Sequence, residues 1–275
     1  MSDKARLGRI RYLNVLPIYY AMEHLFAENG YVLTPGAPEE LNRAMRQGDV
    51  DLGSISSMEY ARNFGDYLLL PDLSISSQGP VGSVLLFSRT PFAGLDGLSV
   101  QVSLASASGA ALLKVLMAEH FQVRPHYCPG HLGAAGASEV QAALAIGDEA
   151  LAIKQRGCFP FELDLGAAWQ ELTGLPFVFG VWAVRRDFAA PRPEEVAALH
   201  RLLLRSRDWG LNALPELSRL AAAPAGMTPE QVLAYFGQLD FSLTPRHEQG
   251  LATFFQYLYK LGELTVLPQL EYFRG

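Results

Sequence analysis

The sequence is poor in cysteine and in charge. Its 275 residues include two cysteines, Cys128 and Cys158, which form no CxxC pair. This excludes a disulfide-stapled mini-protein, and we expect a reduced, cytoplasmic chain. Charged residues make up 18% of the chain, and 22 basic against 28 acidic residues give a net charge of −6. We therefore expect no basic surface for nucleic acid.

Long apolar runs and several enzyme motifs are also absent. The longest apolar stretches, such as LPFVFGVWAV at 175–184, are too short to cross a bilayer, and the start MSDKARLGRIRYLN has no apolar core of a signal peptide. The six histidines lack metal-ligand spacing. There is no nucleophile elbow, phosphate loop, dinucleotide fingerprint or zinc motif. We expect no metal, no organic cofactor and no membrane partner.

The chain does contain alternating strand and helix patterns. A strand pattern at 7–13 precedes a helical pattern at 15–27, and a strand at 98–104 precedes a helix at 109–121. Such alternation is typical of an α/β sheet. The C-terminal part is helical, with apolar residues three and four apart in 251–258, and carries no catalytic pattern. We expect these helices to cover a sheet.

Small polar side chains stand at three junctions where an expected strand runs into a helix. They are Asn14 at the first junction, Ser54, Ser56 and Ser57 at the second, and Ser106 and Ser108 at the third. Helix N-termini expose unpaired N–H groups and attract anions, and such junctions line the ligand crevice of open α/β sheets. Asn and Ser are also ordinary N-caps. Both interpretations, plain capping and a carboxylate-binding cleft, remain open at this point.

Two further stretches have a structural and a functional interpretation. Residues 76–83, SSQGPVGS, contain glycines that let a backbone approach a ligand closely, but they also suit a surface turn before a strand. Asp148 and Glu149 follow an apolar run and could form an acid–base pair or cap the next helix. Capping is the favoured interpretation because Ala150 and Leu151 continue a helical pattern.

Five stretches of the sequence, in order, resemble the chorismate dehydratase family of menaquinone biosynthesis by the futalosine route. They are GRIRYLNVLPI (8–18), GDVDLGSISSMEY (48–60), LLPDLSISSQGPVGSVLLFS (69–88), LAIGDEAL (144–151) and DLGAAWQELTGLPFVFGVW (164–182). Five ordered blocks are far more specific than one short motif. The C-terminal part resembles the family only in its helical pattern, without a matching stretch of sequence.

The resemblance implies a type II periplasmic-binding-protein-like fold. Two α/β lobes would close over a ligand cleft, with the hinge crossed twice, near Ser88–Thr90 and near Phe179–Trp182. Residues 1–88 plus 181–275 would form the first lobe and 89–180 the second. The C-terminal helices would then complete the first lobe, and the lobes would move as hinged bodies.

The reaction implied is loss of water from chorismate to give 3-[(1-carboxyvinyl)oxy]benzoate, without metal or cofactor. The family's functional Asn and Ser fall on Asn14 of RYLN and Ser83 of GPVGSV. The proton at ring carbon C3 would be taken by the substrate's own enolpyruvyl carboxylate or, alternatively, by Asp148. Substrate-binding positions are expected at Ser56, Ser57, Ser106, Ser108 and Gly147.

The third junction departs from the family. Where members often carry Ser-x-Thr-Ser, this chain has Ser106-Ala107-Ser108-Gly109. Ser108 can replace the threonine hydroxyl, but Gly109 offers no side chain, so we expect the carboxylate contact at this junction to use backbone N–H instead.

Two other functions are compatible with the same fold. A sister enzyme of the pathway makes 1,4-dihydroxy-6-naphthoate, and its family carries a histidine in an Ile-His-Glu-like motif where this chain has Ile146-Gly147-Asp148. A transporter's solute-binding protein would need a secretion signal or a lipid anchor. Both alternatives are therefore less favoured than the dehydratase.

Overall fold

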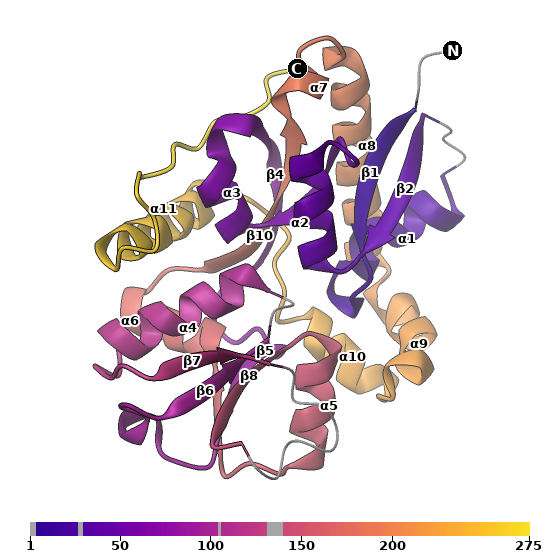
Figure 1. The fold of residues 1–275 in the computed structure, drawn as a ribbon. Helices are drawn as coiled ribbons and strands as arrows, with labels where there is room; N and C mark the ends of the chain where they lie inside the picture. Colours follow the sequence, from indigo (N-terminus) through magenta and orange to yellow (C-terminus); the bar gives the residue numbers. More distant parts are fainter. Residues whose placement is uncertain (1–3, 27–29, 104–105, 131–139) are drawn as a thin grey trace.

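The computed structural model describes residues 4–26, 30–103, 106–130 and 140–275. They form two lobes, each built on a five-stranded sheet (Figure 1). The first sheet has the order β2-β1-β3-β10-β4 and the second the order β7-β6-β8-β5-β9. This confirms the predicted α/β class with two lobes.

The first sheet combines early strands with a late one. It consists of β1 (Ala5–Ile10), β2 (Tyr31–Gly36), β3 (Leu52–Ser56), β4 (Tyr67–Ser77) and β10 (Phe177–Arg185). Strands β1, β2 and β3 run parallel, whereas β10 lies antiparallel between β3 and β4. The residues of β10 are buried from Phe177 to Val184, as expected for an apolar central strand covered on both faces.

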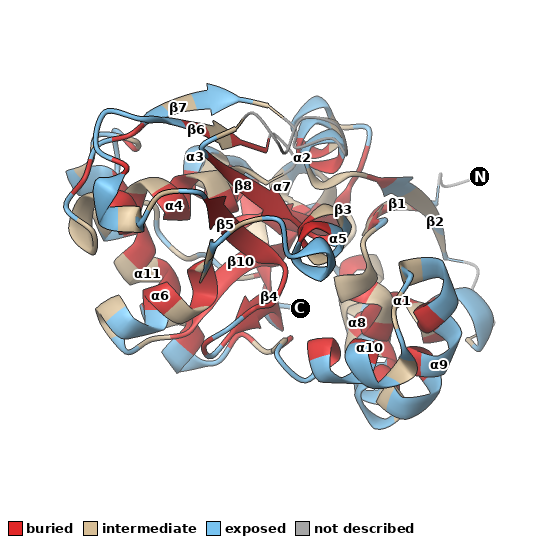
Figure 2. Cartoon of the chain, turned by 90° about the horizontal axis from the view of Figure 1, so that it is seen from below, coloured by how far each residue is buried: buried red, intermediate tan, exposed pale blue. Residues whose placement is uncertain are grey.

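The second sheet is contiguous in sequence. It consists of β5 (Val84–Ser88), β6 (Ser99–Val102), β7 (His126–Pro129), β8 (Ala142–Ile146) and β9 (Phe161–Asp164). Strand β5 pairs antiparallel with both β8 and β9. Figure 2 shows β5, β8 and β10 buried along their length.

Sheet pairing places both connections between the lobes earlier than predicted. The chain leaves the first sheet after Ser77 and enters the second at Val84, so the first connection is 78–83 rather than Ser88–Thr90. The second connection is 174–176, ahead of the predicted Phe179–Trp182. The reason for the first difference is that β5, VLLFS, pairs with β8 and β9, whereas we had expected it in the first lobe.

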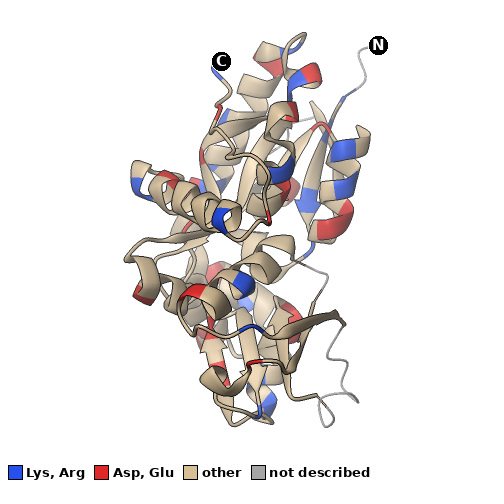
Figure 3. Ribbon diagram, turned by 60° about the vertical axis from the view of Figure 1, so that its left-hand side comes forward, with Lys and Arg blue, Asp and Glu red and all other residues tan. Residues whose placement is uncertain are grey.

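Helices cover both sheets. The first lobe carries α1 (Leu16–His24), α2 (Pro38–Gln47), α3 (Ser57–Asn63), α7 (Arg186–Ala189), α8 (Pro193–Asn212) and α11 (Pro245–Lys260). The second lobe carries α4 (Ala107–Glu119), α5 (Asp148–Arg156) and α6 (Leu165–Thr173). Acidic and basic residues are distributed over both lobes (Figure 3).

The C-terminal helices have two roles. As predicted, α8 packs on α1 and β4, and α11 packs on β10, so both cover the first sheet. In contrast, α9 (Leu214–Ala225) and α10 (Pro229–Phe236) pack on each other around Leu217, Val232 and Phe236. Leu13 and Leu151 pack on the same cluster, so this helix pair lies beside residues of both lobes.

One apolar core runs through both lobes. It includes Met58 of α3, Leu112 of α4, Trp169 of α6 and Phe254 of α11. The ring centroid of Phe177 lies 5.3 Å from that of Trp169 and 4.8 Å from that of Phe254. The lobes are therefore joined by packed side chains as well as by two connections. None of the described helices is long and apolar enough to cross a membrane.

Candidate functional site

A cavity of about 60 Å³ lies between the two sheets. Its walls combine apolar side chains, including Ile10, Ile55, Val84, Ile146 and Phe179, with small polar ones. The structure brings five of the eight predicted site residues together in this lining: Asn14, Ser56, Ser83, Ser106 and Gly147. Because these residues come from both lobes, a ligand here would contact both.

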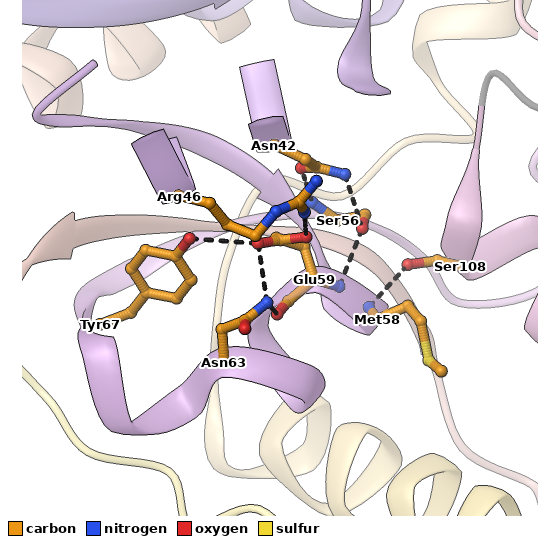
Figure 4. A network of polar contacts seen from close by, with 8 residues as sticks. All are labelled: Asn42, Arg46, Ser56, Met58, Glu59, Asn63, Tyr67 and Ser108. Carbon is orange, nitrogen blue, oxygen red and sulfur yellow. Dashed lines mark hydrogen bonds and ion pairs between the residues drawn. The ribbon is translucent and has the colours of Figure 1, made fainter. Parts of the chain in front are cut away.

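Ser56 presents its hydroxyl in a fixed orientation (Figure 4). Its Oγ caps α3 by accepting the backbone N–H of Glu59 at 3.0 Å, and it also accepts the side-chain amide of Asn42 at 3.2 Å. The Asn42 Oδ1 in turn accepts the backbone N–H of Ser56 at 3.1 Å. A hydroxyl oxygen has two lone pairs, and both are used here, so the Ser56 proton is left to donate.

Glu59 is a buried carboxylate next to this hydroxyl (Figure 4). It is ion-paired with Arg46 and accepts the hydroxyl of Tyr67 at 3.1 Å and the amide of Asn63 at 2.9 Å. Burial raises the pKa of Glu59 above its ordinary value, although Arg46, Tyr67 and Asn63 oppose the shift. Arg46, Tyr67 and Asn63 hold the Glu59 carboxylate beside α3, and Glu59 does not line the cavity.

Two buried polar atoms of the cavity have no partner within the described residues. They are the Oδ1 of Asn14 and the Oγ of Ser54. An unpaired polar atom away from water costs about 1–3 kcal/mol, so such atoms point to a ligand or to water. Together they offer one amide oxygen as acceptor and one hydroxyl as donor.

Ser83 lies on the first connection, buried between the lobes. Its backbone carbonyl accepts the N–H of Gly147 at 2.7 Å, and its Oγ accepts the hydroxyl of Tyr235 at 3.0 Å. Tyr235 belongs to α10 and is itself buried. Ser83 is therefore held by the start of α5 and by a C-terminal helix at once.

Gly147 has a backbone conformation that favours glycine. Its φ is +62° and its ψ is −135°, and a Cβ added there would lie 3.3 Å from the ring of Tyr12. Side chains rarely adopt such angles without strain. Position 147 thus supplies close backbone approach but no side-chain group.

At the third junction, Ser106–Gly109, the backbone N–H of Gly109 is paired within the protein. Ser106 caps α4 by accepting the N–H of Gly109 at 3.1 Å. The Gly109 N–H is therefore paired with the helix cap, so it is not available for the backbone contact with a carboxylate that we expect at this junction. The Ser106 hydroxyl lines the cavity instead.

Three predicted site residues lie outside the cavity lining. The Ser57 hydroxyl donates to the carbonyl of Val178 at 2.5 Å. Ser108 accepts the backbone N–H of Met58 at 3.1 Å, which joins α4 of the second lobe to α3 of the first (Figure 4). Asp148 begins α5 and accepts the backbone N–H of Leu13; burial raises its pKa, and this hydrogen bond opposes the shift. Within the described residues, no three His, Cys, Asp or Glu side chains gather to hold a metal ion.

Comparison with known proteins shows which family the chain belongs to. The model of the menaquinone biosynthesis family matches residues 5–260. The chain belongs to this family. It is 32% identical to a chorismate dehydratase from Thermus thermophilus over 92% of this chain and 94% of the relative. It is also 31% identical to a 1,4-dihydroxy-6-naphthoate synthase of the same organism, over 85% of this chain and 78% of that one.

Solved structures confirm the fold of this menaquinone biosynthesis family member. The periplasmic aliphatic sulphonate-binding protein SsuA from Escherichia coli superposes with a TM-score of 0.67 at 14% identity. The match covers 98% of this chain and 91% of that one. At this identity the likeness concerns the fold alone, and it agrees with the predicted periplasmic-binding-protein-like architecture.

Two residues at or beside this family member's cavity were not among the expected site residues. Ser54 belongs to the second junction and was given no binding role, although it stands two positions before Ser56 on β3, and side chains two apart on a strand share a face. No comparable signal exists for Tyr235, because its contact with Ser83 joins positions far apart in the chain.

Proposed function

We propose that the chain is a chorismate dehydratase, a carbon–oxygen lyase that eliminates water from chorismate to give 3-[(1-carboxyvinyl)oxy]benzoate. The observation that carries the proposal is the cavity between the lobes, whose lining combines hydroxyl groups from both lobes with an unpartnered Asn14 oxygen. The Thermus thermophilus relative named for this activity supports the same substrate.

The side chains of the cavity lining suit a small dicarboxylate with an unsaturated ring, such as chorismate. Ser56 and Ser106 have N–H donors on their oxygens, so their protons are free to donate to carboxylates. Apolar residues such as Ile146 and Phe179 can contact the ring. Since the net charge of −6 opposes anions at long range, binding must rest on these local donors.

The elimination breaks the C3–H and C4–O bonds and forms the double bond that makes the ring aromatic. The C3 proton goes to the enolpyruvyl carboxylate of the substrate, and the C4 oxygen leaves as hydroxide. The hydroxide then takes that proton from the carboxyl group, which gives water and restores the carboxylate. Ser83 would donate to the departing oxygen, and Asn14 would orient the substrate. The carboxylate of Asp148 is bound to the Leu13 N–H outside the cavity, which favours the substrate as base.

A substrate base is adequate because it is held close to the proton. Intramolecular groups reach very high effective molarities when they are well oriented. The enzyme's task is then to hold the side chain of chorismate in one conformation, so that elimination proceeds and the competing rearrangement does not.

The proposal is tested by adding purified protein to chorismate and following the aromatic product by absorbance and mass. We expect turnover that survives dialysis against a chelator. Asn14→Ala and Ser83→Ala should each lower kcat by at least about tenfold, or ~1.4 kcal/mol. Asp148→Asn should keep measurable turnover. A folded, ligand-binding Asp148→Asn without turnover would show that the enzyme supplies the base.

The same assay separates the alternatives. A 1,4-dihydroxy-6-naphthoate synthase would leave chorismate unchanged, and the expected histidine of that enzyme has no counterpart at Gly147, where φ of +62° and the nearby Tyr12 ring oppose any side chain. A solute-binding protein would bind without turnover. Either outcome would reject the dehydratase.

A further inference from the structure

Helix α10 lies directly against the first connection between the lobes. A Cβ added to Gly82 would come 3.5 Å from the Tyr235 ring and 2.2 Å from the Gln238 side chain. One residue further on, the Tyr235 hydroxyl lies 3.0 Å from the Ser83 Oγ. The C-terminal helix pair, which carries no catalytic pattern in sequence, therefore reaches the site.

The direction of this hydrogen bond follows from the partners available. Among the described residues, the buried Tyr235 hydroxyl has its hydrogen bond with the Ser83 hydroxyl. If Ser83 donated to Tyr235, the phenol proton would be buried without an acceptor, which is costly. Tyr235 must therefore donate, and the Ser83 proton is left for the cavity. Burial raises the pKa of Tyr235 above its ordinary value, so the phenol keeps its proton.

We propose that Tyr235 is a positioning residue that orients the Ser83 hydroxyl as a donor to the departing C4 oxygen. This inference rests on the proposed dehydratase activity. The second contact on Ser83, from the Gly147 N–H to its carbonyl, fixes the backbone, while Tyr235 fixes the side chain. Neither contact uses the Ser83 proton, which stays available to the leaving group.

The test is a double-mutant cycle with Tyr235→Phe and Ser83→Ala. Tyr235→Phe removes one hydroxyl and keeps the ring that packs on Gly82. We expect kcat to fall about fivefold to tenfold, with KM changed by less than about twofold. In the Ser83→Ala background, Tyr235→Phe should change kcat by less than about twofold, because the group it orients is gone. The matched control is Tyr60→Phe, which also removes a buried hydroxyl, one bonded to the Gln269 carbonyl, and should keep wild-type kcat.

The outcomes distinguish the two proposals. A wild-type protein that forms no aromatic product from chorismate rejects the dehydratase and, with it, the positioning role of Tyr235. If the wild type turns over, wild-type kcat in Tyr235→Phe, or equal losses with and without Ser83, overturns the role of Tyr235 alone. Urea unfolding of the same four proteins reports the hydrogen bond without activity: additive losses of stability would mean that it does not form, which also overturns the inference.

Discussion

The oxygens of Ser56, Ser83 and Ser106 accept hydrogen bonds from neighbouring groups, which leaves the three hydroxyl protons free to donate. Asn42 and Glu59 occupy both lone pairs of Ser56. Tyr235 occupies one on Ser83, and Gly109 one on Ser106. A serine could otherwise act as donor or acceptor, so its neighbours decide which substrate groups it binds.

Asn42→Asp keeps the shape of side chain 42 but should make the Ser56 hydroxyl donate to residue 42 and no longer accept from it. One carboxylate oxygen would still accept the Ser56 N–H, but the other would accept the Ser56 hydroxyl proton and turn it away from the cavity. We expect KM for chorismate to rise by about tenfold or more, since a hydrogen bond to a charged group contributes about 1.5–3 kcal/mol. Steady-state kinetics measures this.

Asn63→Asp is the control, because it adds the same charge next to Glu59 without contacting Ser56. It should leave KM close to that of the wild type. Equal increases in the two variants would mean that charge, and not the orientation of Ser56, weakens binding.

The buried Glu59 should make stability depend on pH. Its pKa is raised above 4.5, first by burial, so between pH 4.5 and the raised value the folded state holds more protons than the unfolded state. The free energy of unfolding must therefore fall as pH rises through that window. Glu59→Gln cannot titrate, and urea unfolding between about pH 4 and pH 8 should show a flatter profile than the wild type. Identical slopes would mean that Glu59 ionises normally in the folded protein.

At the scale of elements, one carboxylate joins a connection to a helix. Asp164 caps α6 by accepting the N–H groups of Gly166 and Ala167 at 2.9 and 3.1 Å. It also accepts those of Val81 and Gly82, the latter at 2.7 Å. The first connection, which carries Ser83, is thus attached to the second lobe.

Asp164→Ala should destabilise the protein by about 2–3 kcal/mol, because it removes a helix cap and leaves the connection's N–H groups unpaired. The measurement is the free energy of unfolding in urea. Asp164→Asn keeps one acceptor oxygen and should lose less. A loss of under about 0.5 kcal/mol in Asp164→Ala would show that water satisfies these groups.

Local signals explain which elements the sequence could predict. Helices α3 and α4 begin directly after the predicted caps Ser56 and Ser106, because capping depends on residues three positions apart. The apolar run VLLFS also predicts a strand. It cannot tell which sheet the strand joins, because that depends on pairing with β8 and β9 far along the chain.

The same limit applies to the site. Asn14, Ser56, Ser83, Ser106 and Gly147 could be predicted because they stand at strand ends or in stretches that resemble a known family. The sequence could not show that Ser108 contacts Met58 across the lobes, or that Asp148 contacts Leu13. Both contacts depend on how the lobes meet.

At the scale of the whole molecule, the lobes are closed on each other. A cavity of about 60 Å³ is far below the roughly 300–1,000 Å³ of typical ligand sites. The lining residues Ser54, Ser56 and Ser83 are each less than 9% exposed. The cavity is therefore too small for a typical ligand as it stands, and we expect the lobes to separate when a substrate enters, although the continuous apolar core opposes wide opening.

Small-angle scattering should detect this motion. We expect the lobes to open and close in solution without ligand, and saturating product to lower the average radius of gyration, since a ligand that contacts both lobes stabilises the closed form. Ser108→Ala removes the hydrogen bond from the Met58 N–H, so without ligand it should be at least as open as the wild type. An unchanged profile on addition of product would mean that the lobes are closed already and that the ligand enters by local motion.

The late position of β10 has a consequence for how the chain folds during synthesis. All five strands of the second sheet lie between Val84 and Asp164, so that sheet can form as soon as its own residues have emerged. The first sheet must wait for Phe177–Arg185, because β10 separates β3 from β4. Until then, two buried strands have open edges on which other chains can pair. The second lobe should therefore fold before the first, although translation of the first lobe begins earlier.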